Sequence, residues 1–235
     1  MKKIGTLFLG LLIIISLALG VLTFMGYNEY RSALAAQDLQ EKIDEIQNQP
    51  NYTSINDISP IYLDAVIAVE DHDFYHHKGI DIESIGRAVL TNLKEGALIE
   101  GGSTITQQLA KNLYFSQEKD FVRKIAELFM TFKMEKTYSK DEILEFYVNS
   151  IYFGEGYYGI GEASQGYFGI SPAALNDEQS IVLAGIPNAP SVYSLSNNPD
   201  LAKQRAYQVL GQMVKYDFID KYRINELQSK IDEIS

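Results

Sequence analysis

The chain has 235 residues, a formal net charge of −11 and no cysteine. This length allows one domain of ordinary size beyond the N-terminal segment, and the acidic balance argues against nucleic acid as a partner, since phosphate-backbone binding needs a basic surface. The missing cysteines exclude disulfides and cysteine-ligated metals, while leaving the redox compartment open.

The N-terminus is apolar. Lys2 and Lys3 precede the apolar residues Ile4–Met25, a stretch of 22 residues. As a helix it would be roughly 33 Å long, enough to span a bilayer core of about 30 Å. A cleaved signal peptide is the alternative, with small residues at 18–20, but the apolar region of such peptides has only about 7–15 residues. We therefore favour an uncleaved anchor, and the two lysines predict that its start lies in the cytoplasm.

The sequence divides into four predicted segments. Residues 1–3 form a cytoplasmic tip, 4–26 a transmembrane anchor, 27–51 a stalk and 52–235 an extracytoplasmic domain. The stalk region is polar and acidic without a continuous apolar face, and we expect it to be helical in part, over 30–48.

Beyond residue 60 apolar residues recur mainly at helical spacing, and period-two alternation is scarce. The sequence therefore predicts a mainly α domain, with loops rich in Gly and Tyr over 152–169. Asn176 and Gln179 are placed to cap a helix start, and Pro187 follows its expected end.

The first cluster of titratable groups follows an apolar run at 65–69, which we expect to end a helix on the core. Glu70 and Asp71 come directly after it. A carboxylate at the edge of a core can serve as a general base near neutral pH, so Glu70 is a candidate base. The alternative is that both carboxylates are solvated or pair with His77 or Lys78. The histidine spacing does not favour a metal site.

The second cluster is Gly-Gly-Ser-Thr-Ile-Thr-Gln-Gln-Leu-Ala-Lys-Asn at 101–112. It reads as a loop that enters a helix, whose free N–H groups and dipole favour an anion. Thr104, Gln108 and Lys111 would share one polar face. No Walker P-loop is present, and an ordinary capped surface helix is the alternative.

The third cluster is Arg123, Lys124 and Glu127, which a helix would bring within one turn. In 101–136 the basic residues outnumber the acidic ones (Lys111, Lys119, Arg123, Lys124, Lys133 and Lys136 against Glu118, Asp120, Glu127 and Glu135). In so acidic a chain this local reversal suggests an anionic ligand, although a salt-bridged surface helix would have the same composition.

Each cluster alone is a weak signal, but their order is specific. The motifs are Glu-Asp-x-x-Phe-x-x-His-x-Gly (70–79), Gly-Gly-Ser-Thr-Ile-Thr-Gln-Gln-Leu-x-Lys-Asn (101–112), Arg-Lys-x-x-Glu (123–127), Lys-x-x-Ile-Leu-Glu-x-Tyr-x-Asn (140–149) and Arg-x-x-x-Val-Leu (205–210). Over about 52–215 the chain resembles the peptidoglycan glycosyltransferases of the class A penicillin-binding-protein type. Gln204, where the family often has a second arginine, and Tyr157, in a Gly-rich loop, depart from the pattern.

The resemblance implies a lysozyme-like fold with a small membrane-proximal subdomain. It also implies polymerisation of lipid II into linear glycan strands, by inverting transfer from a polyprenyl-pyrophosphate-linked glycan to the 4-hydroxyl of the acceptor N-acetylglucosamine. Bifunctional relatives add a transpeptidase. Ser116-x-x-Lys119 and Ser196-x-Asn198 resemble two of its motifs, but no Lys-Thr-Gly accompanies them, so we expect a monofunctional enzyme.

The resemblance also assigns roles. Glu70 is the expected base, and Asp71 is expected to tune or to orient it. Glu127 is expected to anchor the cations, to assist the leaving group or to bind an optional Mg²⁺ or Mn²⁺ at the pyrophosphate; no cofactor is required. The expected substrate-binding residues are Phe74, His77, Gly101, Ser103, Thr104, Gln107, Gln108, Lys111, Asn112, Arg123 and Lys124.

The expected partners are lipid II, the lipid-linked glycan chain, the membrane and other cell-wall synthesis proteins. Tyr114, Phe115 and Phe121 are expected either to dip toward lipid or to pack in the core.

Two other functions fit parts of the sequence. A membrane-tethered lysozyme-like hydrolase or lytic transglycosylase would share the α fold and a catalytic Glu, but it gives no reason for cations at 111, 123 and 124, since a glycan chain lacks pyrophosphate. An anchored scaffold for cell-wall machinery would make the same charges ordinary surface residues.

Overall fold

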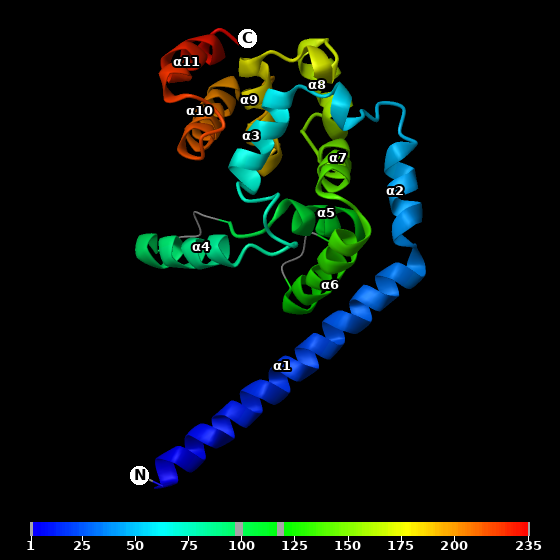
Figure 1. Cartoon of the computed structure of the whole chain (residues 1–235), viewed down its shortest axis with the longest axis vertical. Helices are drawn as coiled ribbons and strands as arrows, with labels where there is room; N and C mark the ends of the chain where they lie inside the picture. The colour runs from blue at the N-terminus through cyan, green and yellow to red at the C-terminus, as the bar shows by residue number, and fades with distance from the viewer. Residues whose placement is uncertain (1, 97–100, 117–119, 235) are drawn as a thin grey trace.

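A computed structural model describes residues 2–96, 101–116 and 120–234, which are almost entirely helical where they are regular (Figure 1). The helices are α1 (Lys2–Ala36), α2 (Leu39–Gln47), η1 (Ile55–Asp57), α3 (Pro60–Glu70), α4 (Ile82–Glu95), α5 (Ile105–Tyr114), α6 (Phe121–Thr137), α7 (Lys140–Ser150), α8 (Gly159–Phe168), η2 (Pro172–Ala174), α9 (Asp177–Gly185), η3 (Ile186–Asn188), α10 (Pro199–Lys215), η4 (Lys221–Arg223) and α11 (Ile224–Asp232). The only β pairing in the described residues is an isolated bridge between Tyr152 and Tyr158. The prediction of a mainly α protein is confirmed.

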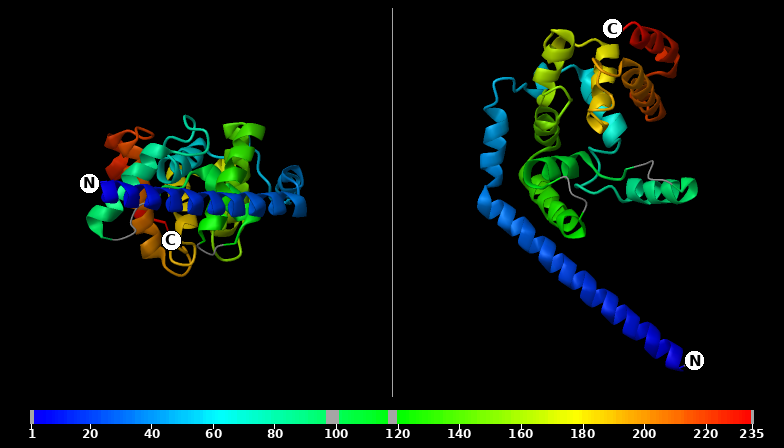
Figure 2. Two further views of the ribbon diagram at one scale, coloured as in Figure 1. Left: turned by 90° about the horizontal axis from the view of Figure 1, so that it is seen from below. Right: turned by 180° about the vertical axis from the view of Figure 1, so that it is seen from behind.

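Helix α1 runs without a break through the predicted anchor boundary at residue 26 and extends beyond it. Over Leu9–Ala36 it is long and apolar enough to cross a membrane. Seen from below, it lies across the globular part of the molecule (Figure 2, left). Its C-terminal end packs against α6, where the rings of Tyr27 and Tyr30 contact Phe129 at centroid distances of 5.3 and 5.8 Å.

Helix α2 corrects one sequence expectation. The segment predicted as a stalk without an apolar face buries Leu39, Ile43 and Ile46, which belong to the same core cluster as the rest of the domain. Their spacing of four and three residues gives one narrow apolar stripe between charged neighbours, and this stripe faces α7. Residues 39–47 are therefore packed onto the globule, with Asp38 as the capping residue.

The core is built by two groups of helices. Helix α3 packs against α9 and α10, and α5 packs against α6 and α7. Tyr62, Phe74, Phe146, Tyr147 and Phe153 are the largest side chains that are fully buried. As expected, the apolar run 65–69 is the last part of a helix on this core, and α9 begins at the predicted Asn176 cap.

The Gly- and Tyr-rich segment 152–169 differs from the expected loop. Its second half is α8, which ends at Gly169 in the left-handed conformation (φ 69°). Tyr157 packs over Gly166 in α8, where a Cβ would lie 2.2 Å from the phenol ring. Because Gly166 has no side chain, the ring of Tyr157 can pack directly against the helix, which accounts for a large residue at position 157.

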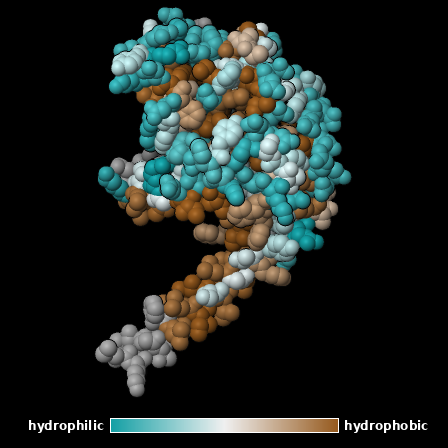
Figure 3. All heavy atoms as spheres, viewed as in Figure 1, coloured by the Kyte–Doolittle hydropathy of each residue, from teal (hydrophilic) through white to brown (hydrophobic). Residues whose placement is uncertain are grey.

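Helix α4 projects from the globule (Figures 1 and 2, right). Its apolar side chains are largely exposed, with Leu90 and Leu93 at 70% and 75% of their full exposure. In Figure 3, brown residues cover most of the coloured part of α1 and are also seen on the neighbouring underside of the globular part. Of the three aromatic residues assigned to lipid or core, Tyr114 and Phe115 pack against the core, while Phe121 is exposed.

Candidate active site

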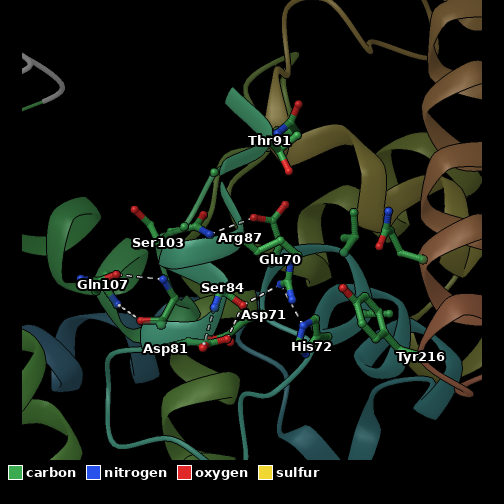
Figure 4. A pocket seen from close by; sticks show the side chains of 18 of the residues that line it. Glu70, Asp71, His72, Asp81, Ser84, Arg87, Thr91, Ser103, Gln107 and Tyr216 are labelled. Atoms are coloured by element: carbon green, nitrogen blue, oxygen red, sulfur yellow. Dashed lines mark hydrogen bonds between the residues drawn. The ribbon is translucent and has the colours of Figure 1, made fainter. Parts of the chain in front are cut away.

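A cavity of about 710 Å³ brings most of the predicted site residues together. Segments from α3 to α6 and from α10 line it. The predicted residues in its wall are Glu70, Asp71, Gly101, Ser103, Thr104, Gln107, Gln108, Lys111, Arg123, Lys124 and Glu127. The close view places Glu70 in the middle, with Ser103 and Gln107 on one side and Tyr216 on the other (Figure 4).

Three predicted residues do not line this cavity. Phe74 is fully buried, with the Lys140 ammonium 4.4 Å from its ring centroid. His77 lies behind Asp71 as its partner, and Asn112 is exposed on the outer face of α5. Phe74 and His77 thus support the cavity wall from the core side.

Glu70 is the last residue of α3, where the chain leaves the core. It is partly buried, and its Oε2 accepts a hydrogen bond of 2.8 Å from Gln108 Nε2 on α5. Gln108 Oε1 in turn accepts a hydrogen bond of 3.2 Å from the buried Tyr147 hydroxyl. A carboxylate held on one oxygen at the cavity surface has the geometry of a general base.

Asp71 is placed differently, although it is the next residue. It is 7% exposed, and its Oδ1 lies 2.9 Å from His77 Nε2. Its Oδ2 accepts the backbone N–H of Ile105, at the start of α5, at 3.0 Å. Asp71 therefore ties the end of α3 to the start of α5, and this geometry favours an orienting role.

The start of α5 corrects a second expectation. Two of the N–H groups assigned to an anionic ligand are used within the protein, because Ile105 donates to Asp71 and Gln107 donates to Thr104 Oγ1. Thr104 also donates its hydroxyl to Gly79 O, and Gln107 Oε1 accepts the Thr104 N–H. Thr104 and Gln107 form a capping box, which fixes the helix that carries Gln108 and Lys111.

The cationic group is organised around Glu127 on α6. The buried carboxylate forms ion pairs with Lys124 and with Arg123, the latter at 2.8 Å, and Lys124 also donates to Ser103 Oγ at 3.1 Å. Burial lowers the pKa of the Lys111 ammonium, while the nearby Glu127 carboxylate acts in the opposite direction. Lys133 and Lys136, two of the cations counted from the sequence, do not line the cavity. Two other charged residues of that count, at 118 and 119, lie outside the described residues.

A family profile described as Transglycosylase matches residues 37–214 of this chain. The chain belongs to the transglycosylase family. Penicillin-binding protein 1F of Bacillus subtilis (strain 168) is 48% identical over 166 residues, 71% of this chain and 23% of the relative. Penicillin-binding protein 1A/1B of the same organism is 41% identical over 198 residues, 84% of this chain and 22% of the relative. The chain thus spans about a quarter of the length of these curated relatives.

Among solved structures, the 2.6 Å crystal structure of penicillin-binding protein 1A from Haemophilus influenzae aligns with a TM-score of 0.46 and 20% sequence identity. The alignment covers 76% of this chain and 17% of that chain.

The transglycosylase cavity has a further wall that the sequence motifs did not predict as a binding surface. Helix α10 contributes Arg205 and Lys215, and Tyr216 follows it. The guanidinium Nε of Arg205 is buried without a hydrogen-bond partner. The Tyr216 ring lies 3.9 Å from the ring of His72, between centroids, and thereby joins the two sides of the cavity. Arg205 belonged to a recognised motif, but nothing in the spacing placed Lys215 in the same cavity as Glu70.

Helix α4 supplies other residues that sequence reasoning missed. Arg87 donates to His72 Nε2 at 3.0 Å and to Ser84 Oγ at 2.7 Å. Asp81 caps α4 by accepting the Ser84 N–H, a contact drawn in Figure 4. These residues line the cavity on the side from which α4 projects.

The expected option of a divalent cation on Glu127 does not fit the side chains of this transglycosylase. Both carboxylate oxygens of Glu127 are already paired with Arg123 and Lys124, whose charges oppose a second cation. In the parts of the chain that the structure describes, no group of three or more His, Cys, Asp or Glu residues could hold a metal ion. The geometry supports Glu127 as the anchor of the cations.

Proposed function

We propose that this transglycosylase polymerises lipid II into linear peptidoglycan glycan strands for cell-wall synthesis. One observation carries the proposal: Glu70 shares a single cavity with Lys111, Arg123 and Lys124 from α5 and α6 and with Arg205 and Lys215 from α10. The reaction joins two polyprenyl pyrophosphates, so it needs one base and two regions of positive charge. The family match and the motif order support the same reaction.

In this proposal the growing glycan is the donor, and its pyrophosphate lies against Lys111, Arg123 and Lys124. The acceptor 4-hydroxyl oxygen attacks C1 of the donor N-acetylmuramic acid while Glu70 takes the hydroxyl proton. The bond from C1 to the pyrophosphate oxygen breaks, and its electron pair leaves with the pyrophosphate. Attack opposite the α-linked leaving group gives a β-1,4 bond.

Two physical effects would accelerate the reaction. A sugar hydroxyl is too weakly acidic to ionise first, so removal of its proton during bond formation helps by typically 10²–10⁴-fold. Charge that develops on the leaving pyrophosphate is stabilised by cations fixed before the reaction begins. The network around Glu127 holds two of these cations in place.

We propose that the acceptor's pyrophosphate lies on the α10 side. Arg205 and Lys215 are the cations of that wall, and they line the same cavity as Glu70 and the α6 cations. The product keeps its pyrophosphate on the acceptor side and must move across the cavity before the next addition. We also propose that α1 holds the enzyme in the membrane with its catalytic domain outside, in the plane where both lipid substrates diffuse.

Incubation of the purified full-length chain with lipid II tests the function. Polymer formation supports the synthase. Shortening of preformed glycan would support the hydrolase, and the absence of any turnover would support the scaffold. The cavity favours the synthase over the hydrolase, because its cations match two pyrophosphates that a glycan chain lacks.

Glu70→Gln tests the base. We expect polymerisation to fall by about 10²-fold or more with the thermal unfolding midpoint unchanged. Asp64→Asn is the matched control, because Asp64 is a partly buried carboxylate on the same helix outside the cavity. Near-normal polymerisation by Glu70→Gln would contradict the assignment.

A further inference from the structure

Two fully buried tyrosines, Tyr62 and Tyr147, lie close enough to Glu70 to interact with its charge, but only one of their hydroxyl groups has a hydrogen-bond partner. Tyr147 on α7 donates to Gln108 Oε1 at 3.2 Å, and Gln108 Nε2 donates to Glu70 Oε2 at 2.8 Å. Tyr62 on α3 is also fully buried, but its hydroxyl has no hydrogen-bond partner. Neither tyrosine lines the cavity, so neither touches a substrate there.

The amide of Gln108 has two ends of opposite polarity, and which end faces Glu70 matters. With the NH₂ group toward Glu70, the contact favours the charged carboxylate. With the carbonyl oxygen toward Glu70, the contact favours the protonated acid, which cannot accept a proton from a sugar hydroxyl. The partner on the other side of the amide therefore decides whether Glu70 is ready to act as a base.

We propose that Tyr147 is a positioning residue that fixes the Gln108 amide with its NH₂ group toward Glu70. The inference rests on the proposed role of Glu70 as the base. Burial raises the pKa of the Tyr147 phenol well above its ordinary value, and the neighbouring Glu70 adds to this effect, so the hydroxyl keeps its proton and remains a donor. A hydroxyl that donates to Gln108 Oε1 holds that oxygen away from Glu70.

Glu70 Oε2 is thereby occupied by Gln108, and no hydrogen bond to Glu70 Oε1 is found among the described residues. Oε1 is the oxygen that would receive the proton of the acceptor hydroxyl. Tyr147 acts through two hydrogen bonds and one amide, at the interface between α5 and α7.

The test compares two isosteric substitutions in the full-length chain in detergent. Tyr147→Phe removes the donor, so Gln108 can turn its oxygen toward Glu70. We expect kcat for lipid II polymerisation to fall roughly tenfold, the acidic limb of the pH–rate profile to move to higher pH, and KM to stay the same. Tyr62→Phe removes a hydroxyl that bonds to nothing, and it should leave kcat, KM and the pH profile unchanged.

A double-mutant cycle shows whether Tyr147 acts through Gln108. In a Gln108→Leu background, Tyr147→Phe should cause no further loss of kcat. An unmoved pH profile in Tyr147→Phe, an equal response of Tyr62→Phe, or full additivity with Gln108→Leu would each overturn the proposal.

A readout without substrate separates this proposal from the proposed function. The side-chain amide of Gln108, assigned in ¹⁵N–¹H spectra by its loss in Gln108→Leu, should show a downfield, hydrogen-bonded proton in the wild type and in Tyr62→Phe. Tyr147→Phe should lose this signal. A Gln108 amide with the shifts of free water-exposed glutamine in the wild type would overturn the relay, whether or not the protein polymerises lipid II.

Discussion

The side chain of Glu127 is the shared ion-pair partner of two cations of the site. Its carboxylate is 2% exposed and has cations on both oxygens. We expect Glu127→Gln to lower the free energy of unfolding by about 2 kcal/mol, because it removes the buried carboxylate charge that pairs with both cations, while Lys124 keeps access to water. The cations would also lose their fixed positions, so kcat should fall roughly tenfold or more. Thermal unfolding and lipid II turnover measure the two effects.

The matched control is Glu226→Gln. Glu226 also pairs with a cation one helical turn away, Lys230 at 2.7 Å, but both side chains are about half exposed. Such surface pairs contribute little, so the unfolding midpoint and the turnover should stay close to the wild type. Equal losses in the two variants would contradict the buried anchor role of Glu127.

Burial of the charged Lys111 ammonium in the cavity wall lowers the stability of the folded state. The unfolded chain binds a proton here with the ordinary pKa of 10.5, and burial lowers the pKa in the folded state. Below the lowered value both states are charged, and the folded state bears the full burial cost. Between the two values the unfolded state binds more protons, so the free energy of unfolding rises with pH in that window.

Lys111→Met removes this cost along with the charge. We expect it to raise the free energy of unfolding by about 1 kcal/mol at neutral pH, and the gain should shrink as the pH approaches 10.5. Polymerisation should be lost through poorer donor handling. Unfolding scans at pH 7 and pH 10 measure the effect, with the exposed Lys133→Met as control. A gain that stays constant or grows with pH would contradict the burial argument.

At the scale of helices, α6 connects α1 to the site. Its Arg123, Lys124 and Glu127 line the cavity, while Ile125 faces α1. Gly26 lies at the crossing point, and a Cβ there would lie 2.5 Å from Ile125 Cγ2 and 3.0 Å from the Val122 carbonyl oxygen. Only glycine lets the two helices approach this closely.

Gly26→Ala should therefore push α1 away from α6. We expect the unfolding midpoint to fall by the equivalent of about 1–3 kcal/mol of overpacking, with a smaller loss of polymerisation as the cations shift. Gly20→Ala is the control, because no atom lies within 4 Å of a Cβ at Gly20 and the change in helix propensity is the same. If both substitutions had the same effect, the crossing would not support the site.

These helices show which parts of the fold and of the site could be predicted from the sequence. The helices that carry Glu70, Lys111 and Arg123 follow from apolar spacing, and their meeting in one cavity followed only from the resemblance. Leu39, Ile43 and Ile46 were missed because three apolar residues among charges do not mark burial until α7 lies against them. Lys215 was missed because its place beside α3 depends on tertiary packing of α10 rather than on any local pattern.

At the scale of the whole molecule, the cavity has an exposed apolar helix, α4, in its wall, and α1 adds a second apolar surface. Helix α1 can span a membrane, and α4 projects from the cavity wall with an exposed apolar face. Figure 3 shows hydrophobic residues along α1 and on the underside of the globular part beside it. This arrangement would let lipid-linked substrates enter the cavity with their polyprenyl chains still in the bilayer.

The double substitution Leu90→Ser/Leu93→Ser tests this arrangement. Both side chains lie on the exposed face of α4, so the fold should tolerate the change. Loss of apolar area at the membrane surface should reduce lipid II turnover in vesicles roughly tenfold, while turnover in detergent stays close to the wild type. Tyr222→Ser is the control, because its ring is 81% exposed but belongs to η4, outside the cavity and the helices near α1. Equal turnover of the double variant and the wild type in vesicles would show that α4 does not engage the membrane.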